Sequence, residues 1–99
     1  MNTQEYLDKV KAELGITSDY ALQKPLKLTR SSISKLRHGG TMSDETAAEV
    51  AKVLKMHPGL VMLDMHRERA KTPAERSIWE EIFKGFRTLL PLANGRRVA

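Results

Sequence analysis

Residues 18–39, with the sequence SDYALQKPLKLTRSSISKLRHG, decide the fold of this chain of 99 residues. Apolar residues occur in this stretch where two short helices joined by a tight turn would need them. They are Leu22 and Leu26 in the first segment, Leu28 between the segments, and Ile33 and Leu36 in the second. This spacing predicts helices over about 19–26 and about 30–38, packed against each other at a steep angle.

Both predicted helices have start and stop signals. Ser18 and Thr29 precede them and are typical N-caps, and Gly39-Gly40 ends the second. The outward side of the second helix combines small, polar and basic side chains, namely Arg30, Ser31, Ser34, Lys35 and His38. A helix face of this kind suits insertion into the major groove of DNA, which is about 12 Å wide.

Positive charge is concentrated around the same segment. The whole chain has a net charge of +5. Residues 20–40 contain five basic residues and no acid, whereas residues 1–19 contain two basic and four acidic residues. Such a distribution is expected of a nucleic-acid-binding protein, and a solvated basic surface is the alternative.

Helical spacing continues through the rest of the chain, and no stretch alternates as a strand would. We predict further helices over about 3–14, from Ser43 to Leu54, over about 58–70 and over about 73–90. Pro58 and Pro73 stand at first helical positions, and Pro91 is predicted to end the last helix. The predicted core faces contain Tyr6, Leu7, Val10 and Leu14 in the first helix and Ala47, Val50, Val53 and Leu54 in the fourth. The expected fold is all-α, a compact bundle of about five to six helices.

Several classes of function are not expected. The chain has no cysteine, and neither His57 nor His66 has a ligand partner at metal-binding spacing. We find no glycine-rich phosphate loop and no catalytic arrangement, so we expect no enzyme, no cofactor and no small-molecule substrate. No apolar run approaches the roughly 20 residues that cross a bilayer, and the N-terminus lacks a signal-peptide pattern. The expected location is therefore the cytoplasm.

Residues 18–39 resemble the motif of Cro/C1-type (XRE) helix-turn-helix regulators of phages and bacteria. The chain is especially similar to phage-associated members through Ser18–Lys24, Met42–Ala47 and Glu68–Pro73, and the likeness covers roughly residues 3–79. It implies a lambda-repressor-like bundle in the bacterial cytoplasm whose third helix binds double-stranded operator DNA, usually as a homodimer. Carried over by position, the DNA-binding residues are Thr29, Arg30, Ser31, Ser34, Lys35 and His38.

Other basic residues near the motif are predicted to contact backbone phosphate, namely Lys24, Lys27 and Arg37. Two roles are considered for His38: it contacts phosphate, or it is a cation that stabilises the C-terminus of its helix.

The motif departs from the family pattern in its first helix and turn. Gln23 and Lys27 stand where the family usually has alanine and glycine. Pro25 removes a backbone donor, so a kinked or partly 3₁₀ helix is predicted there. Asp19 stands where many members have a phosphate-contacting glutamine, and we interpret it as a first-turn acid favoured by the helix dipole.

The predicted last helix has more large apolar residues than covering a small bundle requires. They are Ile78, Trp79, Ile82, Phe83, Phe86, Leu89 and Leu90. This helix either folds back onto the helices at 3–14 and 58–70 or forms a homodimer interface, for which Trp79, Ile82, Phe83, Phe86 and Leu90 are the candidates. We therefore divide the chain into a helix-turn-helix domain (1–71), a C-terminal helix (72–90) and a flexible basic tail (91–99) that includes Arg96 and Arg97.

These observations predict a transcriptional regulator that binds a specific DNA sequence, such as a phage or prophage repressor or a Cro-like protein. A homodimer would place two recognition helices one DNA turn apart, about 34 Å, on a palindromic operator. Two alternatives use a degenerate helix-turn-helix: a protein-interaction module such as an antirepressor, and the DNA-binding antitoxin of a toxin pair.

Overall fold

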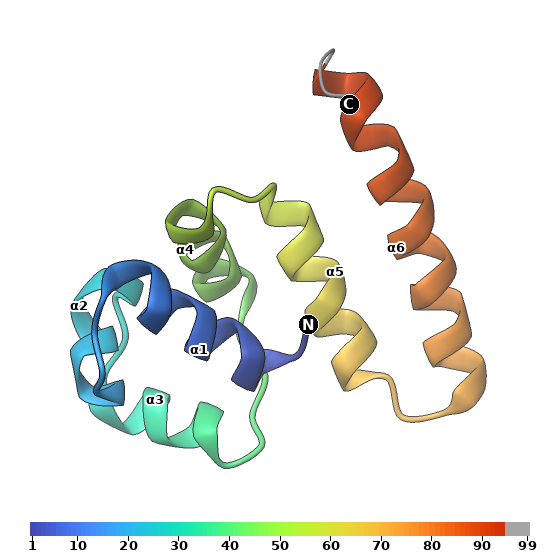
Figure 1. Cartoon of the computed structure of the whole chain (residues 1–99). Coiled ribbons are helices and arrows are strands. Elements are labelled where there is room, and N and C mark those ends of the chain that lie inside the picture. The colour runs from blue at the N-terminus through green and yellow to red at the C-terminus, as the bar shows by residue number, and fades with distance from the viewer. Residues whose placement is uncertain (95–99) are drawn as a thin grey trace.

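The computed structural model describes residues 1–94, and their secondary structure is entirely helical (Figure 1). In chain order the helices are α1 (Thr3–Leu14), the 3₁₀ helix η1 (Asp19–Leu22), α2 (Gln23–Leu26), α3 (Arg30–Arg37), α4 (Asp44–Leu54), α5 (Pro58–Arg69) and α6 (Pro73–Asn94). Over the described residues the chain is thus an all-α, compact globule of six α-helices, which confirms the predicted class. None of these helices is long and apolar enough to cross a membrane.

Local capping fixes where most helices begin. Ser18, Thr29 and Ser43 each accept a hydrogen bond from a backbone N–H three residues later, as predicted. Two further caps were not predicted from the sequence. Asn2 and Glu5 form a capping box at the start of α1, and the His57 ring accepts a bond from the backbone of α5.

The predicted helix at 19–26 is split into η1 and α2, so the prediction of a partly 3₁₀ helix is confirmed. A single helix would have placed Pro25 in its interior. Because α2 begins at Gln23, Pro25 instead lies in a first turn, where a backbone N–H needs no partner within the helix. The split therefore accommodates the proline.

Lys27 ends α2 in the left-handed conformation, with φ 55° and ψ 45°. Its N–H and that of Leu28 donate to the carbonyls of Lys24 and Gln23, at 3.2 and 2.9 Å. These bonds satisfy the free carbonyls at the helix end and turn the chain toward α3. A side chain at this φ strains the backbone, and glycine would not.

We therefore expect Lys27→Gly to stabilise the fold by about 0.5–1 kcal/mol. Lys24→Gly is the matched control and should destabilise the fold, because Lys24 lies within α2. Thermal unfolding followed by circular dichroism measures both changes. A loss of stability in Lys27→Gly would show that the left-handed turn is not strained.

The core lies where α1, α4 and α5 meet, with η1, α2 and α3 closing one side (Figure 1). Its largest fully buried side chains are Tyr6, Leu7, Leu22, Leu26, Met42 and Met65. The inward pair of α3, Ile33 and Leu36, is also buried, as predicted. Leu14 is 42% exposed, so its predicted place in the core is wrong. It stands at the last position of α1, next to the left-handed cap residue Gly15, where the chain leaves the helix.

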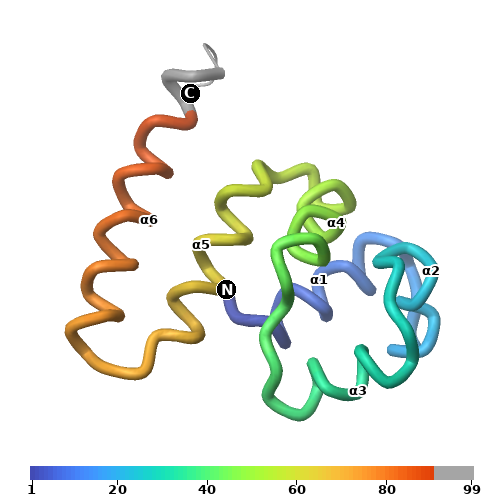
Figure 2. Tube along the Cα trace, turned by 180° about the vertical axis from the view of Figure 1, so that it is seen from behind, coloured from blue at the N-terminus to red at the C-terminus, as the bar shows by residue number. Residues whose placement is uncertain are grey.

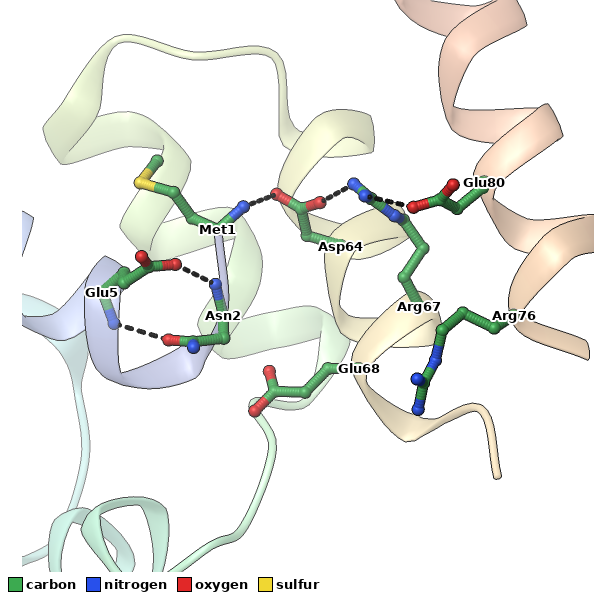
Figure 3. A pocket seen from close by; sticks show the side chains of 8 residues that line it. All are labelled: Met1, Asn2, Glu5, Asp64, Arg67, Glu68, Arg76 and Glu80. Atoms are coloured by element: carbon green, nitrogen blue, oxygen red, sulfur yellow. Dashed lines mark hydrogen bonds and ion pairs between the residues drawn. The ribbon is translucent and has the colours of Figure 1, made fainter. Parts of the chain in front are cut away.

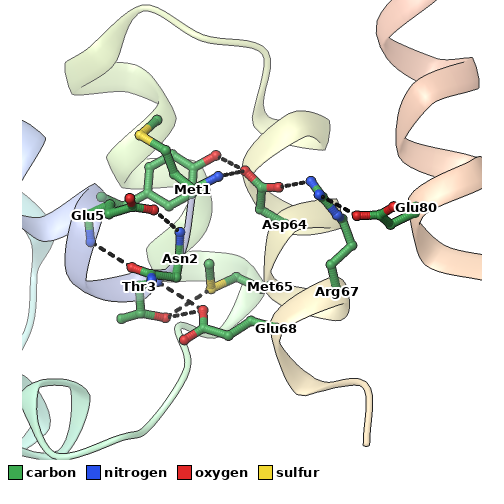
Figure 4. Close-up of polar contacts among 10 residues, drawn as sticks. Met1, Asn2, Thr3, Glu5, Asp64, Met65, Arg67, Glu68 and Glu80 are labelled. Carbon is green, nitrogen blue, oxygen red and sulfur yellow. Dashed lines mark hydrogen bonds and ion pairs between the residues drawn. The ribbon is translucent and has the colours of Figure 1, made fainter. Parts of the chain in front are cut away.

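A polar cluster ties α1 to α5 and α6 (Figure 4). The buried carboxylate of Asp64 accepts hydrogen bonds from the Tyr6 hydroxyl, the Met1 amino group and Arg67. Arg67 also bonds Glu80 of α6 at 3.1 Å. Burial, together with the bond to Asp64, raises the pKa of Tyr6, which therefore stays a neutral donor.

A pocket of about 400 Å³ opens beside this cluster, between α1, α5 and α6 (Figure 3). Its charged groups bond mainly to one another or to backbone, as Arg67 does to Asp64 and Glu80. We therefore interpret its lining as part of the scaffold.

Helix α6 packs along α5 through aromatic contacts. The Trp79 ring stacks on the His66 ring, with 4.4 Å between the ring centres, and the Phe86 and His57 rings form a T-shaped contact with 5.1 Å between their centres. The guanidinium of Arg67 lies over the Phe83 ring. In Figures 1 and 2, α5 lies between α6 and the part of the fold that contains α3.

The prediction that Pro91 ends this helix is wrong, because α6 continues to Asn94. A proline removes one backbone donor, and a helix can continue past it at the cost of a hydrogen bond and some bending. Arg96 and Arg97 of the predicted basic tail lie outside the described residues.

Candidate nucleic-acid interface

The outward side of α3 carries a row of exposed polar and basic side chains, which we call the α3 face. It consists of Thr29, Arg30, Ser31, Ser34, Lys35 and His38, all exposed. On the opposite side, Ile33 and Leu36 anchor α3 in the core. The Thr29 hydroxyl caps the helix by accepting a bond from the Ser32 N–H at 3.1 Å. The predicted face is therefore assembled on one helix that is fixed from both its end and its inner side.

Arg30 lies against an aromatic ring that was not predicted as part of the site. Its guanidinium lies 4.5 Å from the centre of the Tyr20 ring, and Tyr20 is 50% exposed. A hollow of about 240 Å³ lies beside this pair and extends along α3 to His38. The cation–π contact limits the rotamers of Arg30 before any ligand binds. Tyr20 was missed because only folding brings η1 beside the start of α3.

Arg37, predicted to contact phosphate, faces the scaffold instead of the α3 face. Its guanidinium donates to Asp19 through two nitrogens, at 3.0 and 2.9 Å, and to Gln4 and Asp8 at 2.8 Å. The structure thus uses Arg37 to tie α3 to α1 and η1. Sequence spacing could not reveal this, because the partners lie 18 to 33 residues away.

The same network accounts for Asp19. Besides Arg37, its carboxylate accepts a bond from Lys11 at 3.0 Å. The Arg37 hydrogen bonds lower the pKa of Asp19 from its ordinary value of 3.8, and the Lys11 bond adds to this effect. The acid beside the α3 face is therefore neutralised by two cations and presents little repulsion to an anion.

The lowered pKa gives a pH dependence with a definite sign. The ionised carboxylate stabilises the fold above pH 3.8, and this contribution is lost as the pH falls through the lower pKa of the folded state. We expect Asp19→Asn to lower the free energy of unfolding by about 1 kcal/mol at pH 7. The effect is this small because the ion pair is partly exposed to solvent. Urea unfolding should show this difference shrinking toward zero below about pH 4. A difference that persists at low pH would contradict the assigned ion pairs.

The remaining basic residues of the candidate site differ in their surroundings. Lys24 is exposed on α2, and Lys27 is exposed while pairing with Glu49 at 3.3 Å. The His38 ring nitrogen Nδ1 lies 2.7 Å from the Ser34 carbonyl oxygen. This contact fits a group that stabilises the C-terminus of α3, one of the two alternatives for His38.

The predicted dimer residues do not share one exposed surface. Trp79, Phe83, Phe86 and Leu90 are partly buried, and the first three contact α5. Ile82 is 44% exposed. His57 and His66 serve in capping and stacking, and the described residues include no group of side chains suited to a metal ion.

Comparison of the sequence with protein-family models, with curated proteins and with solved structures gave no match in any of the three.

Proposed function

We propose that this chain is a transcriptional regulator that binds a specific sequence of double-stranded DNA through the α3 face. In this proposal η1 and α2 are the first helix of a helix-turn-helix, Lys27 to Thr29 are the turn, and α3 is the recognition helix. The observation that carries the proposal is the α3 face itself. Six polar or basic side chains project from a helix whose other side is buried, with no acid among them.

The dimensions and chemistry of α3 suit the major groove. An α-helix is about 10–12 Å across with its side chains, which matches the groove width of about 12 Å. The eight residues of α3 extend about 12 Å along the groove. Arg30, at the first turn, has the fork of donors that bonds guanine in a bidentate way. Lys35, Ser31 and Ser34 follow on the same side and can donate to base edges or phosphate oxygens. These residues would supply the sequence preference.

Lys24 and Lys27 lie on the segment before α3 and would contact phosphate. Such contacts give affinity without sequence information and fix the orientation of α3 in the groove. Arg37 is left out of the proposed interface, because its guanidinium is engaged with Asp19, Asp8 and Gln4. Regulation would follow from occupying a promoter and blocking, or assisting, the polymerase there.

A selection from random DNA duplexes, followed by a salt titration on the recovered site, tests the proposal. We expect one preferred sequence and an affinity that falls with rising salt, with a slope of about −2 per protomer for the two phosphate contacts of Lys24 and Lys27. Lys24→Gln should reduce the steepness of this slope by about 1, whereas Lys71→Gln, at an exposed position after α5, should leave the slope unchanged. Absence of binding at low salt would refute the proposal.

A further inference from the structure

Helix α6 carries two apolar rows, of which α5 covers only one. The covered row is Trp79, Phe83 and Phe86, which contact α5 or its cap residue His57, together with the partly buried Leu90. The second row, which we call the open seam, is Ile78, Ile82, Gly85 and Leu89. Its three large side chains are 57%, 44% and 59% exposed. They are among the most exposed large apolar side chains of the described residues, and they all lie on one helix.

The spacing of the open seam is that of a helix–helix interface. Its members follow one another at intervals of four, three and four residues, the pattern of paired helices in a coiled coil. Each member precedes a residue of the covered row by one position, or about 100° around the helix. A second helix can therefore lie beside α6 without displacing α5.

We propose that the open seam binds the open seam of a second copy of this chain, with the two α6 helices antiparallel. In that register Ile82 of one copy faces Gly85 of the other, and Ile78 faces Leu89. A Cβ built on Gly85 would meet no atom within 4 Å, so the space above this residue is open. The seam thus offers a gap opposite each Ile82, which a large side chain can fill.

The charges of α6 favour the antiparallel direction. Its first half, residues 73–83, has Glu75, Glu80 and Glu81 against Arg76, a net charge of −2, and Glu80 also pairs with Arg67 of α5. Its second half, residues 84–94, has Lys84 and Arg87 and no acid, a net charge of +2. Antiparallel pairing sets each acidic half against a basic half, and it also opposes the two helix dipoles. Parallel pairing would set like charges together.

This inference does not depend on DNA binding, and its tests contain no DNA. If no dimer forms, the proposed DNA binding by the α3 face is unaffected. If no DNA binds, the proposed dimer is likewise unaffected.

The first test is the oligomeric state of the full chain. Sedimentation should show a dimer whose self-association is weakened about 100-fold or more by Ile82→Glu, because a charge would be buried in the seam. Ser77→Glu adds the same charge to α6 outside the seam and should leave the dimer intact. Both variants should stay folded by circular dichroism, since both positions are exposed. A monomeric wild type, or an unchanged dimer in Ile82→Glu, would overturn the proposal.

Two further variants test the register. Gly85→Leu should abolish the dimer without lowering the thermal stability of the protomer, because its side chain would occupy only the space reserved for Ile82 of the partner. The chain has no native cysteine, so introduced ones report pairing cleanly. Ile78→Cys and Leu89→Cys should form a mixed disulfide when combined, and neither should cross-link efficiently with itself. Efficient cross-linking of each variant with itself, or a dimer that survives Gly85→Leu, would refute the antiparallel register.

Discussion

Replacing Arg30 with alanine is expected to reduce the preference of the protein for its selected DNA site by about 5- to 150-fold. Arg30 is the group on the α3 face best suited to bidentate contact with guanine, and one such contact contributes about 1–3 kcal/mol of discrimination. The measurement compares binding of the selected duplex with duplexes altered at single base pairs. Discrimination should be lost at one position of each half-site and kept at the others.

Two controls separate base contact from general effects. Lys27→Ala should weaken binding to all duplexes alike, as expected for a phosphate contact. Tyr20→Ala should reduce discrimination at the same base pair as Arg30→Ala, whereas Tyr20→Phe should retain it, because phenylalanine preserves the ring beneath the guanidinium. An Arg30→Ala variant with unchanged discrimination would remove Arg30 from the recognition surface.

The second large effect is on stability. Asp64→Ala is expected to lower the free energy of unfolding by about 3–5 kcal/mol, because it leaves the buried Tyr6 hydroxyl and the Arg67 guanidinium without their shared acceptor. Urea unfolding at pH 7 measures the loss. Glu81→Ala, which removes an exposed acid from α6, is the matched control and should change stability by less than about 0.5 kcal/mol.

A double variant tests whether this loss comes from the cluster. Tyr6→Phe removes one donor, so Asp64→Ala should cost less in the Tyr6→Phe background than in the wild type. If the two losses simply add, Tyr6 and Asp64 are not coupled and the polar cluster does not hold α1 to α5.

Much of the fold could be predicted because its determinants are local. The caps Ser18, Thr29 and Ser43 act on amides three residues away, and Pro58 marks the start of α5. The division of the predicted helix at 19–26 into η1 and α2 also follows from one residue, Pro25. These signals depend on covalent neighbours and on helical periodicity, both of which are written in the sequence.

The parts that could not be predicted depend on distant contacts. Arg37 looks like one more basic residue of the motif until folding brings Asp19 and Asp8 to it. The apolar residues of α6 gave no sign of which row α5 covers, so the predicted dimer residues mixed Ile82 with the covered Trp79 and Phe83. Periodicity identifies an apolar face, and only packing shows which part of it stays exposed.

DNA binding by α3 can be tested directly with an amide chemical-shift map, recorded while the selected duplex is added to the labelled protein. We expect the largest changes at residues 29–38, with smaller changes at Lys24 and Lys27 and few along α6. Changes centred on α6 or α4, with α3 unaffected, would contradict the assignment of α3 as the DNA-binding helix.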